Sequence, residues 1–577
     1  MERRLLLVFA LTFVVILLFQ PLLKKYLPQP PAPKPEAAQP QSPQALPDQA
    51  PLPSAAKVVS GTPVAGKKVA AAPSNKQAET EAETVIENDL YKITFSNRGG
   101  RVKSWILKKY KDKPNGQPLD LVNSAAAGKY GYPLTLWTYD EGLRNKLNSA
   151  LYVTASTGTS APAEISFDYS DGELAVHKSY KFDHSYIVEV HASVEVNGAP
   201  VSAFPMWPSG FGDETTASAY AAGQIAYQYD ANVERLAMKK ISGGGTVPGP
   251  FQWAGVSDQY FAAVIIPGNS QSAALVTLRN QIEIPHKPSD KNDKQLDKVD
   301  VLGIAVGSLK GPTAVRMYVG PKTLESLQSV QVPGITGAEP DLRGIVDFGW
   351  LGLIARPLFL WLKWTFKYVH NWGWAIVIQT IIINLALLPL RLSQMKSMLK
   401  MQRVAPQIKA IQEKYKKYSL RDPKKAEMNE EISALYKKEG VNPIGGCLPL
   451  LIQMPFLFAY YRMLGVAIDL RHATWLWVPD LSAPDPIYIL PIAIVITMFL
   501  MQRMTPQAGM DLAQQKMMNF MMPAMLGYIS FNLASGLCLY WAMGQLIGIV
   551  QQWSLNQSSL GREMREMMEK RARKKEK

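Results

Sequence analysis

The chain has 577 residues, is 47% hydrophobic and carries a formal net charge of +15. This length exceeds one ordinary domain, and the mean hydropathy near zero indicates that apolar and polar residues are segregated along the chain. Only two cysteines occur, Cys447 and Cys538, and both lie in apolar stretches, which excludes a disulfide-stapled fold.

Six apolar stretches predict membrane-spanning helices, because roughly 20 helical residues cross a hydrocarbon core of about 30 Å. They lie near residues 5–23, 372–390, 447–468, 486–502, 517–531 and 534–553. No small-x-small cleavage site follows the first stretch, so we interpret residues 1–27 as an uncleaved anchor rather than a signal peptide.

The positive charge is concentrated in two segments. Residues 391–440 hold 13 Lys and Arg against 6 Asp and Glu, a net +7. Residues 562–577 hold 8 against 4, a net +4. With a cytoplasmic N-terminus, an even number of crossings places both segments in the cytoplasm, as the positive-inside rule requires.

The segment between the first two predicted spans changes in composition and in hydrophobic periodicity along its length. Residues 28–83 are rich in Pro, Ala, Gln and Ser and predict a disordered tether. Residues 84–324 show period-two stretches such as "YIVEVHASVEV" and predict an antiparallel β domain of sandwich type. Residues 325–371 predict a connector ending in an amphipathic helix, whose tryptophans alternate with Lys and Arg as at a headgroup layer. A buried linker helix is the alternative.

No pattern for catalysis or metal binding stands out. The histidines of the β segment are scattered, and the Gly-rich "SGGGTVPGP" lacks the G-K-[ST] of a phosphate loop. We therefore expect no enzyme activity, no metal and no cofactor. A sugar-active or sugar-binding sandwich is kept as a minor alternative.

The last part of the chain carries four motifs in order: "KKEGVNPIGGCLPLLIQMPFLFAYYRML", "WVPDLSAPDPIYILP", "QQKMMNFMMP" and "SGLCLYW". Together they resemble the YidC family of membrane protein insertases, and "WAGVSDQYFAAVIIP" and "YVGPK" are similar to the periplasmic domain of its Gram-negative members. The resemblance implies an α-helical polytopic protein of the bacterial inner membrane. It would have an anchor helix, an inserted all-β periplasmic supersandwich and a five-helix insertase core at residues 372–557.

The same resemblance implies a function. The chain would insert and fold nascent membrane proteins, alone or with the Sec translocon, without hydrolysing a nucleotide. Residues 393–440 predict a cytoplasmic helical hairpin split near Pro423, with a Met-rich apolar face and a solvated basic one. The resemblance implies that the hairpin receives substrate and that the basic tail, residues 558–577, approaches the ribosome through electrostatic contacts.

Polar residues within the predicted spans are candidates for a substrate groove open to cytoplasm and lipid. They are Thr380, Asn384, Arg391 and Arg462. Aligning Pro389 with the family's proline places Asn384 where most members carry an arginine, thought to attract acidic substrate flanks. We expect Asn384 to supply polarity and Arg391 the remaining attraction. A snorkelling Arg462 and a purely structural Asn384 are the alternatives.

Two further sets of residues follow from motif position. Met454, Leu457 and Trp541 resemble the family's apolar slide, on which a substrate helix leans before it enters lipid; ordinary helix packing is the alternative. Residues expected to shape helix entrances and kinks are Pro389, Gly445, Gly446, Pro449 and Pro455.

A channel or secondary transporter is the main alternative function, because broken helices and intramembrane amides suit it as well. The sequence shows no inverted repeat between its halves, which such transporters often have.

Overall fold

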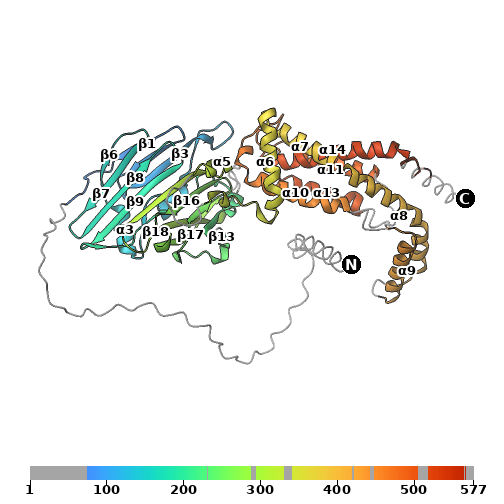
Figure 1. The fold of residues 1–577 in the computed structure, drawn as a ribbon, viewed down its shortest axis with the longest axis horizontal. Coiled ribbons are helices and arrows are strands. Elements are labelled where there is room, and N and C mark those ends of the chain that lie inside the picture. The colour runs from blue at the N-terminus through green and yellow to red at the C-terminus, as the bar shows by residue number, and fades with distance from the viewer. Residues whose placement is uncertain are drawn as a thin grey trace, which may run out of the picture. The chain divides into compact units, whose positions relative to one another are not determined.

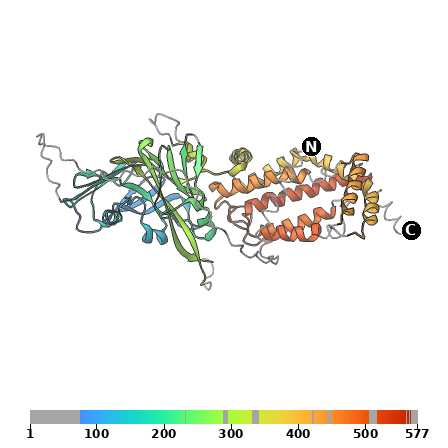
Figure 2. The ribbon, with the colours of Figure 1, turned by 90° about the horizontal axis from the view of Figure 1, so that it is seen from below.

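The computed structural model describes residues 75–577 except 231, 287–293, 331–340, 419–421, 442–447, 505–516, 560, 564–565 and 567–577. The predicted anchor, most of the tether and most of the basic tail lie outside the described residues, as do Gly445 and Gly446. Figures 1 and 2 show the described strands gathered at one end and the long helices at the other.

The strands form three sheets in which every strand pair is antiparallel. One sheet has the order β1 (Glu83–Glu87), β2 (Tyr91–Ser96), β3 (Arg101–Lys111) and β4 (Pro118–Asp120). A second has the order β14 (Gly245–Pro248), β17 (Ala273–Pro285), β18 (Leu296–Ser308), β11 (Phe204–Trp207) and β5 (Leu136–Trp137).

The largest sheet has ten strands. Its order is β13 (Asn232–Arg235), β12 (Gln224–Tyr229), β15 (Trp253–Ser257), β16 (Phe261–Pro267), β19 (Thr313–Pro321), β9 (Ile187–Val196), β8 (Leu174–Phe182), β7 (Ala163–Ser170) and β6 (Val153–Ser156), with β10 (Ala199–Pro200) beside β9. Each strand offers side chains to alternate faces, and β8 shows this period, with every second residue buried.

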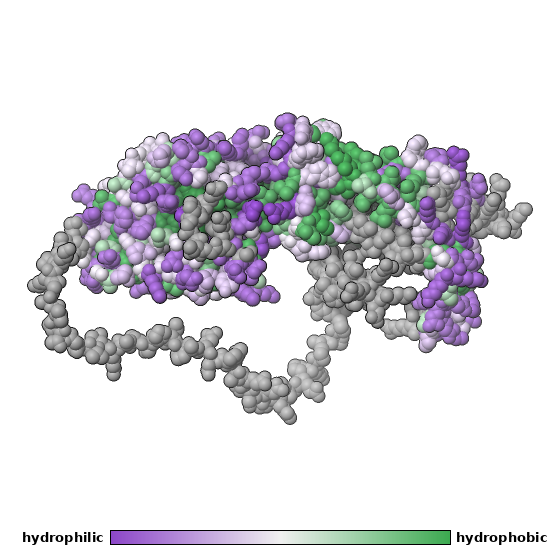
Figure 3. Space-filling model, viewed as in Figure 1, coloured by the Kyte–Doolittle hydropathy of each residue, from purple (hydrophilic) through white to green (hydrophobic). Residues whose placement is uncertain are grey.

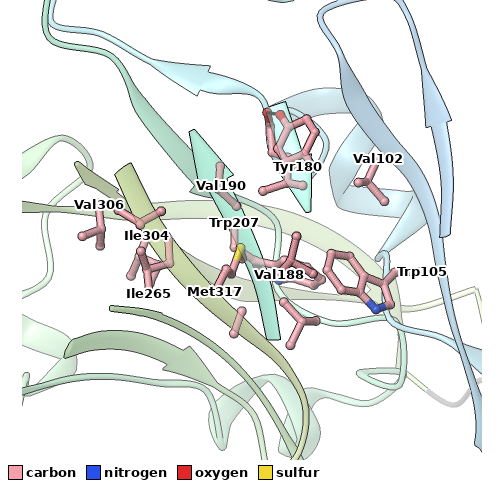
Figure 4. Close-up of a cluster of buried hydrophobic side chains, with 14 of the residues drawn as sticks. Val102, Trp105, Tyr180, Val188, Val190, Trp207, Ile265, Ile304, Val306 and Met317 are labelled. Atoms are coloured by element: carbon pink, nitrogen blue, oxygen red, sulfur yellow. Dashed lines mark hydrogen bonds between the residues drawn. The ribbon is translucent and has the colours of Figure 1, made fainter. Parts of the chain in front are cut away.

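The buried faces meet in one core, which confirms the predicted all-β sandwich. Figure 4 shows Trp105 of β3, Trp207 of β11 and Met317 of β19 converging there, so that all three sheets contribute. Trp105 and Trp207 lie edge to face, with ring centroids 5.9 Å apart. A core of this size stabilises the region without disulfides.

The helices follow in chain order. They are α6 (Gly352–Val369), α7 (Trp372–Ala386), α8 (Leu388–Lys414), α9 (Lys424–Lys438), α10 (Leu448–Val466), α11 (Ile489–Met504), the π-turn η7 (Met517–Met521), α13 (Met522–Ser530) and α14 (Ser535–Gln557). Helices α7, α10, α11, α13 and α14 coincide with the last five predicted spans.

No described helix is, by itself, both long and apolar enough to cross a membrane. Helices α7 and α8 meet that standard only as a pair, bent by 47°. Pro389 lies in the first turn of α8, where its missing N–H costs no helical hydrogen bond. The count of six spans therefore stays a prediction.

The predicted hairpin is formed by α8 and α9, packed through Val404 and Ile408 against Ile432 and Leu435. The first arm of the hairpin is α8, which begins at Leu388, directly after the bend that follows α7, and not near residue 393 as predicted. Lys414 Nζ, at the end of α8, lies 2.6 Å from Glu431 Oε1 on α9.

A buried ionic cluster joins the β region to the connection between α10 and α11. Arg471 Nη2 lies 4.0 Å from Asp213 Oδ2, and its guanidinium stacks over the ring of Tyr260. Close by, Gln259 Nε2 donates at 2.9 Å to the carbonyl oxygen of Gly465, the last residue but one of α10. Burial raises the pKa of Asp213 well above its usual value, and the nearby Asp258 adds to the shift.

We expect this junction to loosen as the pH rises from the ordinary pKa of an Asp through the raised pKa of Asp213 in the folded chain. The pKa of Asp213 is higher in the folded chain than in the unfolded chain. Such a carboxyl contributes its full stabilisation at a pH below its unfolded pKa, and this contribution is lost as the pH rises through its folded pKa. Hydrogen exchange of β15 and β16 in the full chain, corrected for intrinsic rates, checks this. Asp213→Asn mimics the protonated form and should flatten the pH dependence, whereas the exposed Asp89→Asn should not. An unchanged slope in Asp213→Asn would contradict this assignment.

Candidate functional site

Helix α7 buries its polar side chains, together with part of its apolar ones, and exposes only apolar side chains on its outer face. Gln379 and Thr380 are fully buried and Asn384 is 5% exposed, whereas Ile382 and Leu385 are 44% and 55% exposed. A helix on the surface of a water-soluble protein has the opposite polarity. This arrangement suits a helix whose outer face meets hydrocarbon and whose inner face meets other polar groups.

Large apolar side chains are exposed on other helices as well. Figure 3 shows hydrophobic surface gathered over the helical end, while the β region and α8–α9 are mainly hydrophilic. On α11, Ile489, Ile492, Ile496 and Leu500 are all 43% exposed or more. Their spacing of three and four residues puts them on one face, and an apolar surface of this extent is unusual for a protein surrounded by water.

Thr380 and Asn384 are four residues apart and lie one above the other on the inner face of α7. Thr380 Oγ1 donates to the Ile376 carbonyl oxygen at 2.7 Å, and Asn384 Nδ2 donates to the Thr380 carbonyl oxygen at 2.9 Å. Both donors are thus satisfied within α7, and the Asn384 Oδ1 acceptor remains for a partner outside it.

Two side chains from other helices complete this group. Arg391 Nη2, from the first turns of α8, donates to Asn384 Oδ1 at 3.3 Å. Gln551 Nε2, from α14, donates to the Asn384 main-chain carbonyl oxygen at 3.2 Å. Thr380, Asn384, Arg391 and Gln551 together are termed the polar cluster below. Sequence reasoning found three of its members and missed Gln551.

Gln379 was also missed, and it lies outside the polar cluster. Its Nε2 donates to the Leu358 carbonyl oxygen of α6 at 3.0 Å, and its Oε1 accepts from the Tyr460 hydroxyl of α10. The Tyr460 ring stacks on Tyr540 of α14 at 4.0 Å between centroids. Gln379 therefore ties four helices together. Its five-residue offset from Asn384 puts it about 140° around the helix, a signal that separates the two amides.

The structure does not bring Arg462 into the polar cluster. Its Nη2 donates to Asp347 Oδ2 at 2.9 Å, in the connector before α6, and Asp347 also lies 3.9 Å from Arg235 of β13. The partner of Arg462 is thus a carboxylate in the connector, at the junction with the β region, and a groove role for Arg462 stays a prediction.

The proposed slide residues lie on two neighbouring helices. Met454 and Leu457 are half-buried on α10, and Trp541 is half-buried on α14. Leu457 and Trp541 both pack against the helical core. Pro455 stands between the two α10 residues, inside the helix, and Pro449 belongs to the first turn of α10. Their role toward a substrate stays a prediction.

Nothing in the described part of the chain is arranged for a metal. Among the described residues, no group of three or more His, Cys, Asp or Glu side chains is placed to hold an ion.

Comparisons with known proteins match both regions of the chain. A family model described as the 60Kd inner membrane protein matches residues 364–562, and a YidC periplasmic domain model matches residues 83–361. Membrane protein insertase YidC of Syntrophus aciditrophicus is 31% identical, covering 97% of this chain and 100% of its own. The protein of the same description from Geobacter metallireducens is 33% identical, covering 88% of this chain and 94% of its own.

A solved structure is also similar. It is a crystal structure of an active YidC insertase with the first transmembrane domain resolved, 18% identical, covering 85% of this chain and 95% of its own, with a TM-score of 0.34. At this score the spatial likeness adds no argument, and the sequence matches carry the comparison.

Proposed function

Because the chain belongs to the YidC family of membrane protein insertases, we propose that it inserts and folds nascent proteins in the bacterial inner membrane. The observation that supports a mechanism is the polarity of α7, with Thr380 and Asn384 turned inward and an outer face that carries apolar residues such as Ile382 and Leu385. This polarity is what a groove for a polar substrate segment at the edge of lipid requires.

The polar cluster would receive the hydrophilic flank of a nascent segment. A charged side chain costs about 3 kcal/mol at the bilayer centre, so donors and acceptors within the membrane shorten the barrier that the flank must cross. Asn384 and Gln551 offer amides without the desolvation cost of a buried ion, and Arg391 adds one cation. No covalent step is needed.

The apolar part of the substrate would lean on Met454, Leu457 and Trp541 before it moves into the bilayer. These side chains are half-buried, so part of each is available to a passing helix. Met side chains adapt to varied partners, which suits a surface that meets many sequences.

The remaining assignments belong to this proposal too. The topology has six spans, cytoplasmic termini and a periplasmic β region, with the domain boundaries given by the sequence. The α8–α9 hairpin would receive the nascent chain, and the basic tail would approach the ribosome through phosphate contacts that weaken with salt. The Sec translocon would be a partner for part of the substrates.

Reconstitution in proteoliposomes tests the function. The purified chain should integrate a small single-span protein, so that its translocated end becomes protected from added protease. Flux of small solutes without integration would instead indicate the channel or transporter. Photo-crosslinkers at Met454, Leu457 and Trp541 should capture a stalled nascent span. Capture only from Val550, a control on α14 that is 62% exposed, would contradict the slide.

A further inference from the structure

The guanidinium of Arg391 lies against a glycine of α14. A Cβ atom built at Gly548 would lie 2.8 Å from Arg391 Nη1 and 3.3 Å from Arg391 Nη2. It would also lie 2.6 Å from Met501 Cε of α11. Real Cβ atoms essentially never lie below 3.0 Å from such neighbours, so a methyl group at Gly548 would push the Arg391 guanidinium and the Met501 methyl group, both flexible side-chain ends, out of their present positions.

The space beside Gly548 determines where the guanidinium of Arg391 lies. A long cationic side chain near the end of a membrane helix normally extends toward the headgroups and water. Arg391 instead turns back toward α7, and its Nη2 reaches Asn384 Oδ1 at 3.3 Å. The space beside Gly548 is what permits that path.

A second residue on the same face of α14 points to the same place. Gln551 follows Gly548 by three residues, which puts the two on one side of the helix. Gln551 is 8% exposed, and its Nε2 holds the Asn384 carbonyl oxygen. Its buried Oε1 has no hydrogen-bond partner among the described residues. On this face of α14, the guanidinium of Arg391 thus packs against Gly548, and the Gln551 Oε1 atom provides an acceptor one turn away that is unpaired within the described part of the chain.

We propose that Gly548 is a positioning residue of the insertase, which keeps the charge of Arg391 inside the groove beside Asn384 and thereby sets the preference for substrates with acidic flanks. The inference rests on the proposed function. The inference adds that Gly548, a residue without a side chain, controls the selectivity of the groove by positioning Arg391.

The chain contains a matched control. Gly544 lies one turn earlier on the same face of α14, against the same face of α7. A Cβ there would lie 3.8 Å from Asn384 Nδ2 and 3.9 Å from Thr380 Cγ2, which is ordinary contact. Gly544→Ala therefore adds the same methyl group beside the polar cluster without displacing Arg391.

The experiment uses the full chain in proteoliposomes and two single-span substrates that differ only in an acidic or a neutral flank. Gly548→Ala should lower insertion of the acidic-flank substrate about fivefold and leave the neutral one within about twofold. Gly544→Ala should keep the parental ratio. In an Arg391→Gln background, Gly548→Ala should change the ratio no further, since both substitutions remove one interaction.

A second variant separates packing from charge. Met501→Ala removes one of the two close neighbours and leaves Arg391 in place, so the defect of Gly548→Ala should persist in the Met501→Ala background. Disappearance of the defect there, or an equal loss for both substrates, would overturn the proposal in favour of helix packing. Failure of the parental chain to insert either substrate would instead refute the proposed function.

Discussion

Replacing Lys178 by methionine should lower the free energy of unfolding of the β region by about 3 kcal/mol. Lys178 is fully buried on β8, and its ammonium donates to the carbonyl oxygens of Gly99, Gly100 and Leu134 at 2.9, 2.8 and 2.7 Å. Methionine has nearly the same length but no donor. Three buried acceptors would lose the hydrogen bond from Lys178, each at about 1 kcal/mol, and only the longer contacts of the single Tyr180 hydroxyl with the Gly100 and Leu134 carbonyl oxygens would remain.

These carbonyls depend on Lys178 because their backbone is irregular. Gly99 and Gly100 have φ of +68° and +52°, and Leu134 has a φ of 63°. Residues in this left-handed region interrupt a strand, so their carbonyls lie outside the regular ladder. The lysine nitrogen replaces the missing ladder donors, and burial without a carboxylate partner lowers the pKa of Lys178 to about 7.

Urea unfolding of the detergent-solubilised chain, followed by hydrogen exchange in β2, β3 and β8, measures the effect. Lys181→Met is the control, because Lys181 lies on the same strand, 58% of its side chain is exposed, and its partner Glu164 is 3.8 Å away. Such a surface pair contributes about 0.5 kcal/mol or less. Equal stability of the two variants would mean that the Tyr180 hydroxyl, 3.3 Å from the Gly100 carbonyl oxygen, suffices for these acceptors.

The burial of Lys178 was accessible from the sequence, but its partners were not. In "LAVHKSYKF", the period of a strand places Lys178 on the same face as Val176 and Tyr180, which is the core face. The acceptors come from a turn 78 residues away and from a loop residue at position 134. Local periodicity tells which face a residue takes, and only the assembled sheets tell what it meets there.

In the helical region, too, the sequence predicted local elements but not the partners that distant segments bring together. The apolar stretches predicted the helices of the core. Pro389 was expected to shape a helix entrance or kink, but the position of the bend, after Ala386, was not predicted, because a proline is compatible with either a kinked or a newly started helix. Gln551 escaped notice because its importance depends on the approach of α14 to α7, 167 residues earlier in the chain. The partner of Arg462, Asp347, is 115 residues away in the chain and could not be foreseen from local spacing.

Asn384→Leu is expected to reduce insertion about tenfold or more, for acidic and neutral substrate flanks alike. Leucine removes the acceptor of Arg391 and leaves that cation without its partner in a buried place, where an unpaired polar group costs about 1–3 kcal/mol. Leu385→Ile, on the outward face of α7, is the control and should insert at the parental rate. If Asn384→Leu also inserted both substrates at the parental rate, the amide would have only a structural role and the polar-groove mechanism would be wrong.

A charge exchange then shows whether Asn384 and Arg391 act as one pair. Asn384→Arg alone puts a second guanidinium against the first, which lies 3.3 Å from Asn384 Oδ1, so repulsion should impair insertion. Asn384→Arg combined with Arg391→Asn restores one cation and one amide in the same space, and it should recover most of the activity. Full activity of Asn384→Arg alone would contradict this, because the two residues would then not share a site.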